Sequence, residues 1–375
     1  MTNCHRELQL VDSAPKHDTT ILQPLSRERL ARAKAAYSTR RLDAGRVHGL
    51  LTGNLVPAAG DLVLARVDRP RHHPRLELVD GRRAYLHPGD EIVVAFGNRY
   101  APDQFHAVVP QGLGECHLVA AGGIAGRCIA RHASTRPATE IDAMGVLADA
   151  AGARLNLRDF ALGPPAAQRS SPVVVAIAGS SMNAGKTTTA EQLALGLSRH
   201  GWRVGAGKVT GTAAGGDAWR LRDAGAWPVI DFTDAGHAST YCLPAPEVER
   251  VFDRIVAGIA QAGVDVAVIE IADGLLQAET ARLLESERFR QTVDHVLFAA
   301  GDALSALHGA AWLGERGLPL RLVTGAIGQS PLAMQEAAGC LDVAVLPPSA
   351  LADPDTATAL ARPPVAAMAG LAESC

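Results

Sequence analysis

The stretch PVVVAIAG (172–179), followed directly by SSMNAGKTTT (180–189), decides the fold of the second half of this 375-residue chain. The first eight residues form an almost continuous apolar run, which is typical of a strand buried on both faces of a parallel sheet. The residues after it suit a tight turn that opens a helix. A Gly-Lys-Thr sequence in this strand–turn–helix context is characteristic of a phosphate-binding loop. We therefore expect this segment to begin an α/β domain and to bind phosphate.

Each residue type in the loop has a defined chemical task. Backbone N–H groups of the turn and of the helix N-terminus can surround a phosphate. Lys186 can reach the β- and γ-phosphate oxygens, and the Thr187 hydroxyl can take a place on Mg²⁺. The alternative is a chance Gly-Lys-Thr at an ordinary strand-to-helix turn. We predict that the nucleotide is bound by Gly179, Ser180, Asn183, Ala184, Gly185, Lys186, Thr187 and Thr188.

Downstream of this loop, apolar strand candidates alternate with helical segments. The strand candidates are WRVGAGKV (202–209), VDVAVIEIA (264–272), VDHVLFAA (293–300), PLRLVTGA (319–326) and LDVAVLPP (341–348), and APEVERVFDRIVAGIAQAG (245–263) is a clear helix. Strands that alternate with helices favour a mostly parallel, doubly wound sheet with right-handed crossovers. The predicted fold class is therefore an α/β phosphate-loop NTPase domain.

The chain before residue 170 has a different composition. It contains 22 Lys and Arg against 17 Asp and Glu, whereas the remainder contains 14 against 22. Residues 161–172 have the composition of a linker. Short Val- and Leu-rich segments separated by turn signals over 45–132 suggest a small β-barrel or sandwich, and 139–159 suggests a helix followed by a hairpin or loop. We predict a tail and helix over 1–44, with the helix at 26–37, a β-rich domain over 45–165, the NTPase domain over 170–354 and a tail over 355–375.

Composition narrows the function classes. The longest apolar run is far shorter than the ~20 residues that span a bilayer, and the six scattered cysteines form no C-x-x-C pair. We therefore expect a cytoplasmic protein with no membrane association and no structural metal. Eight Arg and His residues fall within 66–83, either as a patch for an anionic partner or as a solvated hairpin. Because aromatic residues are only 4% of the chain, nucleic acid is an unlikely partner.

The loop spacing resembles a known family. Five residues separate Gly179 from Gly185, and this G-x(5)-G-K-[ST] pattern is similar to that of dethiobiotin synthetase and cobyric acid synthase-type proteins of the SIMIBI class. The resemblance covers about residues 172–354, and the N-terminal domain resembles no family that we recognise. Residue 181 is serine, where ATP-sandwich relatives carry a signature lysine. Residues 325–328 lack the asparagine with which the family recognises adenine, so ATP and GTP both remain open.

The resemblance implies three further site residues. Lys208 matches a family lysine that lies over the reacting phosphates, and Asp217 and Glu270 match its acidic Mg²⁺ ligands. We therefore expect catalysis by Lys186, Lys208 and Glu270, and a metal held by Thr187, Asp217 and Glu270. Each also has a structural alternative. Lys208 could extend its amine into water, and Asp217 could complement a helix dipole, whereas Glu270 ends a strand where such sheets bind ligands.

The family also implies an activity. Its members use ATP and Mg²⁺ to phosphorylate a carboxylate or carbamate and then form a C–N bond, so we expect a ligase or phosphotransferase acting on a small molecule. The expected cofactors are ATP, with GTP possible, and Mg²⁺, and a homodimer is possible. The alternative is a nucleotide-gated binding or maturation protein that switches its affinity for a protein partner. The segments 231–241 and 273–274 could contact substrate, extend the metal site or simply be turns.

Overall fold

The C-terminal domain is built on a seven-stranded sheet, as counted over the residues 20–163 and 171–362 that the computed structural model describes. The strand order is β15-β14-β16-β13-β17-β18-β19, and every paired neighbour is parallel. The strands are β13 (Val173–Gly179), β14 (Val204–Lys208), β15 (Val229–Asp231), β16 (Val266–Glu270), β17 (His295–Ala299), β18 (Leu320–Thr324) and β19 (Ala344–Val345).

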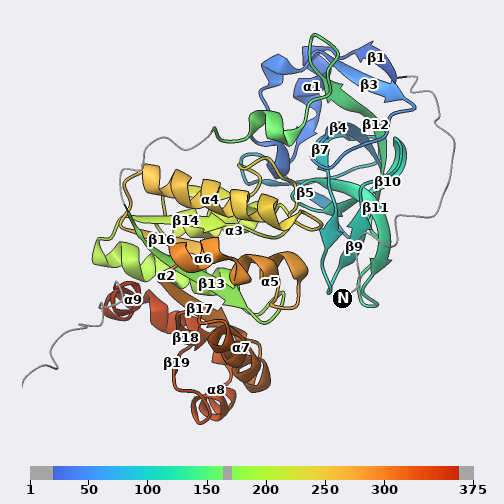
Figure 1. The fold of residues 1–375 in the computed structure, drawn as a ribbon. Helices are drawn as coiled ribbons and strands as arrows, with labels where there is room; N and C mark the ends of the chain where they lie inside the picture. Colours follow the sequence, from blue (N-terminus) through green and yellow to red (C-terminus); the bar gives the residue numbers. More distant parts are fainter. Residues whose placement is uncertain (1–19, 164–170, 363–375) are drawn as a thin grey trace, which may run out of the picture.

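Helices cover both faces of this sheet (Figure 1). Val175 and Ile177 of β13 pack in one cluster with residues of α2 (Lys186–His200), α3 (Gly215–Asp223) and α9 (Pro354–Ala361). Their neighbours Val174 and Ala176 pack in another cluster with residues of helices from the opposite layer. That layer contains α4 (Ala245–Gln261), α5 (Ala278–Glu285), α6 (Glu287–Thr292), α7 (Ala303–Glu315) and α8 (Pro331–Ala338). Alternate residues of β13 therefore pack against opposite helix layers. Helices on both faces of a parallel sheet confirm the predicted doubly wound α/β class.

The parallel register brings the predicted site residues to one edge of the sheet. Glu270 of β16 stands opposite Lys208 of β14 on one side and Ile177 of β13 on the other. The carboxyl ends of these three strands therefore meet where β13 leads into the phosphate loop, which is the edge at which doubly wound sheets bind ligands.

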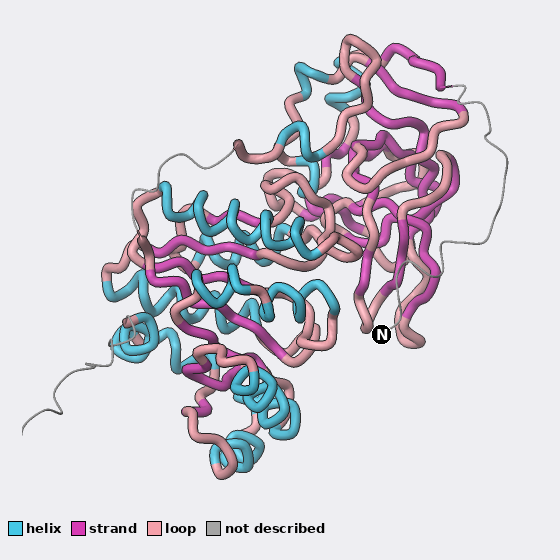
Figure 2. The backbone as a smooth tube through the Cα atoms, in the orientation of Figure 1, coloured by secondary structure: helices cyan, strands magenta, loops and turns pink. Residues whose placement is uncertain are grey.

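Five strands of the N-terminal domain close into a small barrel. In cyclic order they are β4 (Leu62–Arg69), β7 (Glu91–Phe96), β11 (Ile124–Arg131), β10 (Gly114–Ala120) and β12 (Thr139–Ala148), and only the β7–β11 pair in this cycle is parallel. Further strands extend the barrel or form a hairpin beside it (Figure 2). They are β1 (Thr20–Pro24), β2 (Lys34–Ala35), β3 (Gly49–Gly53), β5 (Arg75–Glu77), β6 (Arg83–Tyr85), β8 (Arg99–Tyr100) and β9 (Phe105–Val108).

Several boundaries differ from those predicted. Residues 20–35 join the barrel, because β1 pairs with β3 and β2 pairs with β7, so the helix expected over 26–37 is limited to α1 (Arg27–Arg32). The helix predicted from residue 139 is wrong, since β12 occupies that segment with alternating buried and half-buried residues. Helix α9 lies within the predicted C-terminal tail and packs on α2. Most of the predicted linker lies outside the described residues.

Buried charge joins the two domains. Arg40 Nη2 lies 3.0 Å from Asp231 Oδ1 and 2.6 Å from Asp234 Oδ2, and the Tyr37 hydroxyl donates to Asp231 Oδ2 at 2.7 Å. Beside the Tyr37 ring, Gly215 N donates to Glu77 Oε2 at 2.7 Å. A single cluster of buried apolar residues also continues from the barrel into the α/β domain. The domains therefore share a polar and apolar interface that is largely shielded from water.

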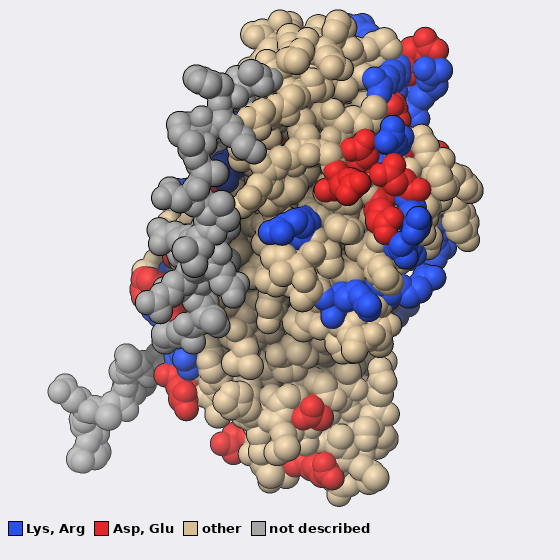
Figure 3. All heavy atoms as spheres, turned by 90° about the vertical axis from the view of Figure 1, so that its right-hand side faces the viewer, with Lys and Arg blue, Asp and Glu red and all other residues tan. Residues whose placement is uncertain are grey.

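The basic run at 66–83 is largely neutralised. Arg66, Arg69, Arg71 and Arg83 all form salt bridges with carboxylates of the same domain. Figure 3 shows one face of the molecule on which basic and acidic side chains are interleaved between broad uncharged areas. These pairings favour the hairpin interpretation of the basic run. Across the described ranges, no helix has the length and apolar character needed to span a bilayer.

Candidate functional site

The phosphate loop is anchored by its neighbours. Ser180 N donates to Ala299 O at 2.9 Å, and Ala326 N donates to Ala184 O at 2.8 Å, so the ends of β17 and β18 support the turn. Gly185, which caps α2, has φ of 97°. A Cβ there would lie 2.9 Å from Gly325 Cα, so both the backbone angle and the close packing require glycine. Asn183 has φ of 65°, a left-handed conformation that asparagine tolerates better than most residues.

The lysine and the threonine of the motif face the inside of the site. Lys186 is 6% exposed, and its Nζ donates to Ser181 O at 2.7 Å across the loop. Burial lowers the pKa of its ammonium, which the nearby acids Glu270 and Asp273 partly offset. The Thr187 hydroxyl donates to Glu270 Oε1 at 3.2 Å. Thr188 is directed elsewhere, since its hydroxyl accepts from Arg220 of α3 at 3.2 Å.

Lys208, Asp217 and Glu270 come together beside the loop. Lys208 Nζ is hydrogen-bonded to Asp217 Oδ2 and lies 3.5 Å from Glu270 Oε1, so it does not extend into water. Burial acts to lower the pKa of Lys208, but the two carboxylates raise it well above its usual value. Burial raises the pKa of Glu270, against the opposing charges of Lys208 and Lys186. Hydrogen bonds and ion pairs thus connect Thr187, Glu270, Lys208 and Asp217, and the charges of Glu270, Lys208 and Asp217 also act on Lys186.

The donor set fits a single Mg²⁺. Glu270 Oε2 is buried and has no hydrogen-bond partner, while Oε1 lies beside the Thr187 hydroxyl. No group of three or more His, Cys, Asp or Glu in the described chain is arranged to hold a metal. A Mg²⁺ ion at a nucleotide site needs only one or two protein oxygens, because phosphates and waters supply the rest. Thr187 and Glu270 meet that need, whereas Asp217 lies in the first turn of α3 and is paired with Lys208.

The turn after β16 packs directly on the phosphate loop. A Cβ at Gly274 would lie 2.3 Å from Ser180 O, so only glycine fits at this contact. Asp273 has φ of 63°, and its carboxylate forms no hydrogen bond or salt bridge with any residue of the described ranges. Burial raises the pKa of Asp273, and the charges of Lys186 and Lys208 act in the opposite direction. Asp273 therefore belongs to the electrostatic environment of the site, and its part in the metal site stays a prediction.

The barrel domain also reaches the loop, which the sequence did not suggest. Asp103, between β8 and β9, accepts a hydrogen bond from Asn183 Nδ2 at 2.6 Å, across 80 residues of sequence. No local motif marks this contact, because it depends on how the two domains pack.

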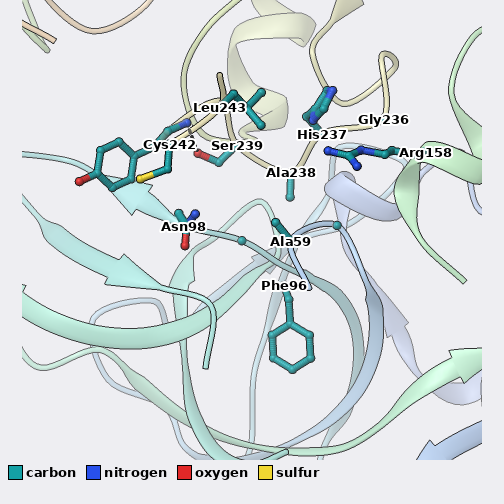
Figure 4. A pocket seen from close by; sticks show the side chains of 13 residues that line it. Ala59, Phe96, Asn98, Arg158, Gly236, His237, Ala238, Ser239, Cys242 and Leu243 are labelled. Atoms are coloured by element: carbon teal, nitrogen blue, oxygen red, sulfur yellow. Dashed lines mark hydrogen bonds between the residues drawn. The ribbon is translucent and has the colours of Figure 1, made fainter. Parts of the chain in front are cut away.

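The segment 231–241 lies at the domain interface. Asp231 and Asp234 bind Arg40, and Ser239 forms an isolated bridge with Thr212. The residues after Asp234 help to enclose a cavity of about 70 Å³ between the domains (Figure 4). Its polar lining includes Asn98 and Arg158 of the barrel domain and His237, Ser239 and Cys242 of the α/β domain. None of the predicted nucleotide or metal residues lines this cavity.

Comparisons with known proteins give little detail. No family model and no curated protein matches the chain. Among solved structures, the chain is similar to the signal recognition particle 54 kDa protein from Aeropyrum pernix K1 in complex with GDP, at 20% identity and a TM-score of 0.37. It is also similar to the signal recognition particle receptor FtsY from Elizabethkingia anophelis, without and with GDP, at 18% and 17% identity and TM-scores of 0.35.

These likenesses are partial. They cover 49% to 50% of this chain and 44%, 59% and 60% of the three matched chains. Dethiobiotin synthetase is not among the three. The site described above therefore rests on the geometry of this chain, and its residue roles remain predictions.

Proposed function

We propose that the C-terminal domain binds a nucleoside triphosphate with Mg²⁺ at the phosphate loop and hydrolyses its terminal phosphoanhydride bond. One observation supports this most strongly. Lys186, Thr187, Lys208 and Glu270, from α2, β14 and β16, converge at the carboxyl edge of the sheet beside a turn stabilised by both neighbouring strands.

The proposed chemistry needs positioning and charge compensation rather than a covalent intermediate. Lys186 and Lys208 supply two positive charges next to the loop, in a region where burial strengthens their electrostatic effect. Bound Mg²⁺ would polarise the phosphate oxygens. Glu270 and Thr187 would hold it, and Asp217 keeps Lys208 oriented through their hydrogen bond.

We propose further that the phosphoryl group is used in a ligase or phosphotransferase reaction on a small molecule. Support comes from the barrel domain, whose Asp103 contacts Asn183 of the loop and so brings a second domain to the site. A second function, a nucleotide-dependent switch, is favoured by the same Asn183–Asp103 contact, because it could transmit the nucleotide state to the barrel. The proposal covers both ATP and GTP, and both nucleotides are tested.

The experiment is steady-state hydrolysis of ATP and GTP, with and without Mg²⁺, by the wild type and Glu270→Gln. We expect the variant to bind nucleotide without metal as the wild type does, but to lose about 100-fold or more of its Mg²⁺-dependent turnover, the scale of removing one preorganised charge. Glu247→Gln, a partly buried acid on α4 paired with His237 and Arg250, is the matched control and should keep full turnover. Equal turnover in Glu270→Gln and the wild type would remove Glu270 from the site.

A further inference from the structure

Arg99 of β8 is a buried cation on which the acids Asp103 and Asp273 act only from beyond salt-bridge distance. It is 7% exposed, and nowhere in the described chain does it form a salt bridge. Its Nη2 donates to Gln104 Oε1 at 2.7 Å, and its Nη1 lies 3.2 Å from Nε2 of His73. The guanidinium also lies 5.8 Å from the centre of the Phe105 ring, and its buried Nε has no hydrogen-bond partner. Burial lowers the pKa of Arg99 to about 10, so it stays charged at neutral pH.

His73 does not neutralise this charge. Burial and the neighbouring Arg99 lower the pKa of His73 to about 3, so its imidazole is neutral near pH 7. The side chains that hydrogen-bond to this buried charge are neutral, and a buried charge is costly unless a counter-ion lies in direct contact with it. The fold therefore retains a desolvated guanidinium that an external anion would stabilise.

Arg99 belongs to the part of the barrel that meets the phosphate loop. Asp103, four residues after Arg99, binds Asn183 at 2.6 Å, and its buried Oδ1 has no partner. From the other domain, the Asp273–Gly274 turn contacts the loop at Ser180. The charges of Arg99, Lys186 and Lys208 all act on Asp273. Asp273 thus interacts electrostatically with the lysines of the phosphate site and with the guanidinium of the barrel.

We propose that Arg99 binds the carboxylate of an acceptor molecule in a site between the barrel and the phosphate loop, with the reacting end of that molecule directed past Asp273 toward Lys186 and Lys208. This inference rests on the proposed function and extends it by naming the substrate class. A guanidinium matches a carboxylate through two parallel hydrogen bonds. Each carboxylate group carries a single charge, so one such group suits the single guanidinium beside Asp103 and Asp273 better than a doubly charged phosphate group does.

The test uses the full chain loaded with Mg²⁺ and a non-hydrolysable triphosphate. Thermal unfolding is followed while succinate, as the carboxylate probe, or inorganic phosphate is added at constant ionic strength. We expect succinate to raise the Tm of the wild type by at least about 2 °C and to leave the Tm of Arg99→Met unchanged. Phosphate should have a smaller effect on the wild type. The matched control is Arg127→Met, an exposed arginine of the same barrel, which should respond as the wild type does.

A structural role for Arg99 makes a different prediction. If Arg99 served only folding, Arg99→Met would unfold well below the wild type before any addition and Arg99→Lys would respond to succinate as the wild type does, and these two results together would overturn the proposal. We expect its Tm without succinate to stay within about 2 °C of the wild type, since an apolar replacement of an unpaired buried charge is tolerated. If Arg99→Met does not fold, Arg99→Lys, which keeps the charge but not the guanidinium fork, should bind succinate at least about tenfold more weakly.

The outcomes separate this inference from the proposed function. A wild type that binds no triphosphate would overturn the nucleotide assignment. A wild type that binds triphosphate normally, but responds to succinate no more than Arg99→Met does, would overturn the carboxylate site alone. A response to phosphate larger than that to succinate would also contradict the carboxylate assignment.

Discussion

Replacing Arg40 with methionine should weaken the domain interface more than any nearby arginine replacement. Arg40 is the cation between Asp231 and Asp234, which are 5% and 7% exposed. Removing it leaves two buried carboxylates facing each other, and breaking a buried ion pair from one side costs about 3–5 kcal/mol. Arg41 is the matched control, because it is more exposed and its Nη1 lies 3.7 Å from Asp234 Oδ1. Arg41→Met should cost about 1 kcal/mol.

The assay is urea unfolding followed by tryptophan fluorescence and circular dichroism. All four tryptophans lie after residue 200, and the Trp219 ring packs against Gly81 of the barrel. Fluorescence therefore reports the α/β domain and its interface, while circular dichroism reports both domains. Adding Asp231→Asn to Arg40→Met should restore part of the lost stability, because one uncompensated charge is removed, with a coupling of about 1–3 kcal/mol. Equal losses for Arg40→Met and Arg41→Met, or no coupling, would refute the buried-pair account.

Two further predictions concern the loop and the interface. Gly274→Ala should weaken triphosphate binding about tenfold in calorimetry, because a new Cβ would press on Ser180 O, whereas Gly112→Ala, with open space around it, should bind normally. The interface should also be acid-sensitive. Burial would raise the pKa of Asp231, but Arg40, Thr233 and Tyr37 hold it below its usual value, so its contribution to stability is present above about pH 4 and is lost as the pH falls further. Wild-type unfolding free energy should therefore drop more steeply below pH 4 than that of Asp231→Asn, and parallel curves would contradict this.

The local sequence was sufficient to predict the fold of the α/β domain. The apolar run of β13, the following turn and the helix are contiguous in the sequence. They can therefore be predicted without knowing any tertiary contact. Lys208 and Glu270 lie opposite each other because β14 and β16 are parallel and end at the same edge of the sheet. The carboxyl edge of this sheet could therefore be predicted from residue types and strand ends alone.

The barrel strand β12 and the domain interface could not be predicted in this way, because they depend on long-range packing. β12 contains Ala, Met and Leu, which favour helices, but closing the barrel between β4 and β10 imposes an extended conformation. The alternation of Ile141 and Ala143 with Glu140 and Asp142 was the available signal for a strand. The contacts of Arg40 with Asp231 and of Asp103 with Asn183 carry no sequence signature, because each joins residues that only the docking of two domains brings together.

The most direct measurement for the central claim is calorimetric titration of ATP and GTP, each with Mg²⁺, into the wild type and Lys186→Ala. The structure places the Lys186 ammonium inside the loop that would hold the phosphates. We predict saturable binding of at least one triphosphate to the wild type and its loss in the variant, with the circular dichroism of both proteins unchanged. Equal binding by the two proteins, or no binding of either triphosphate to the wild type, would contradict the phosphate-loop assignment.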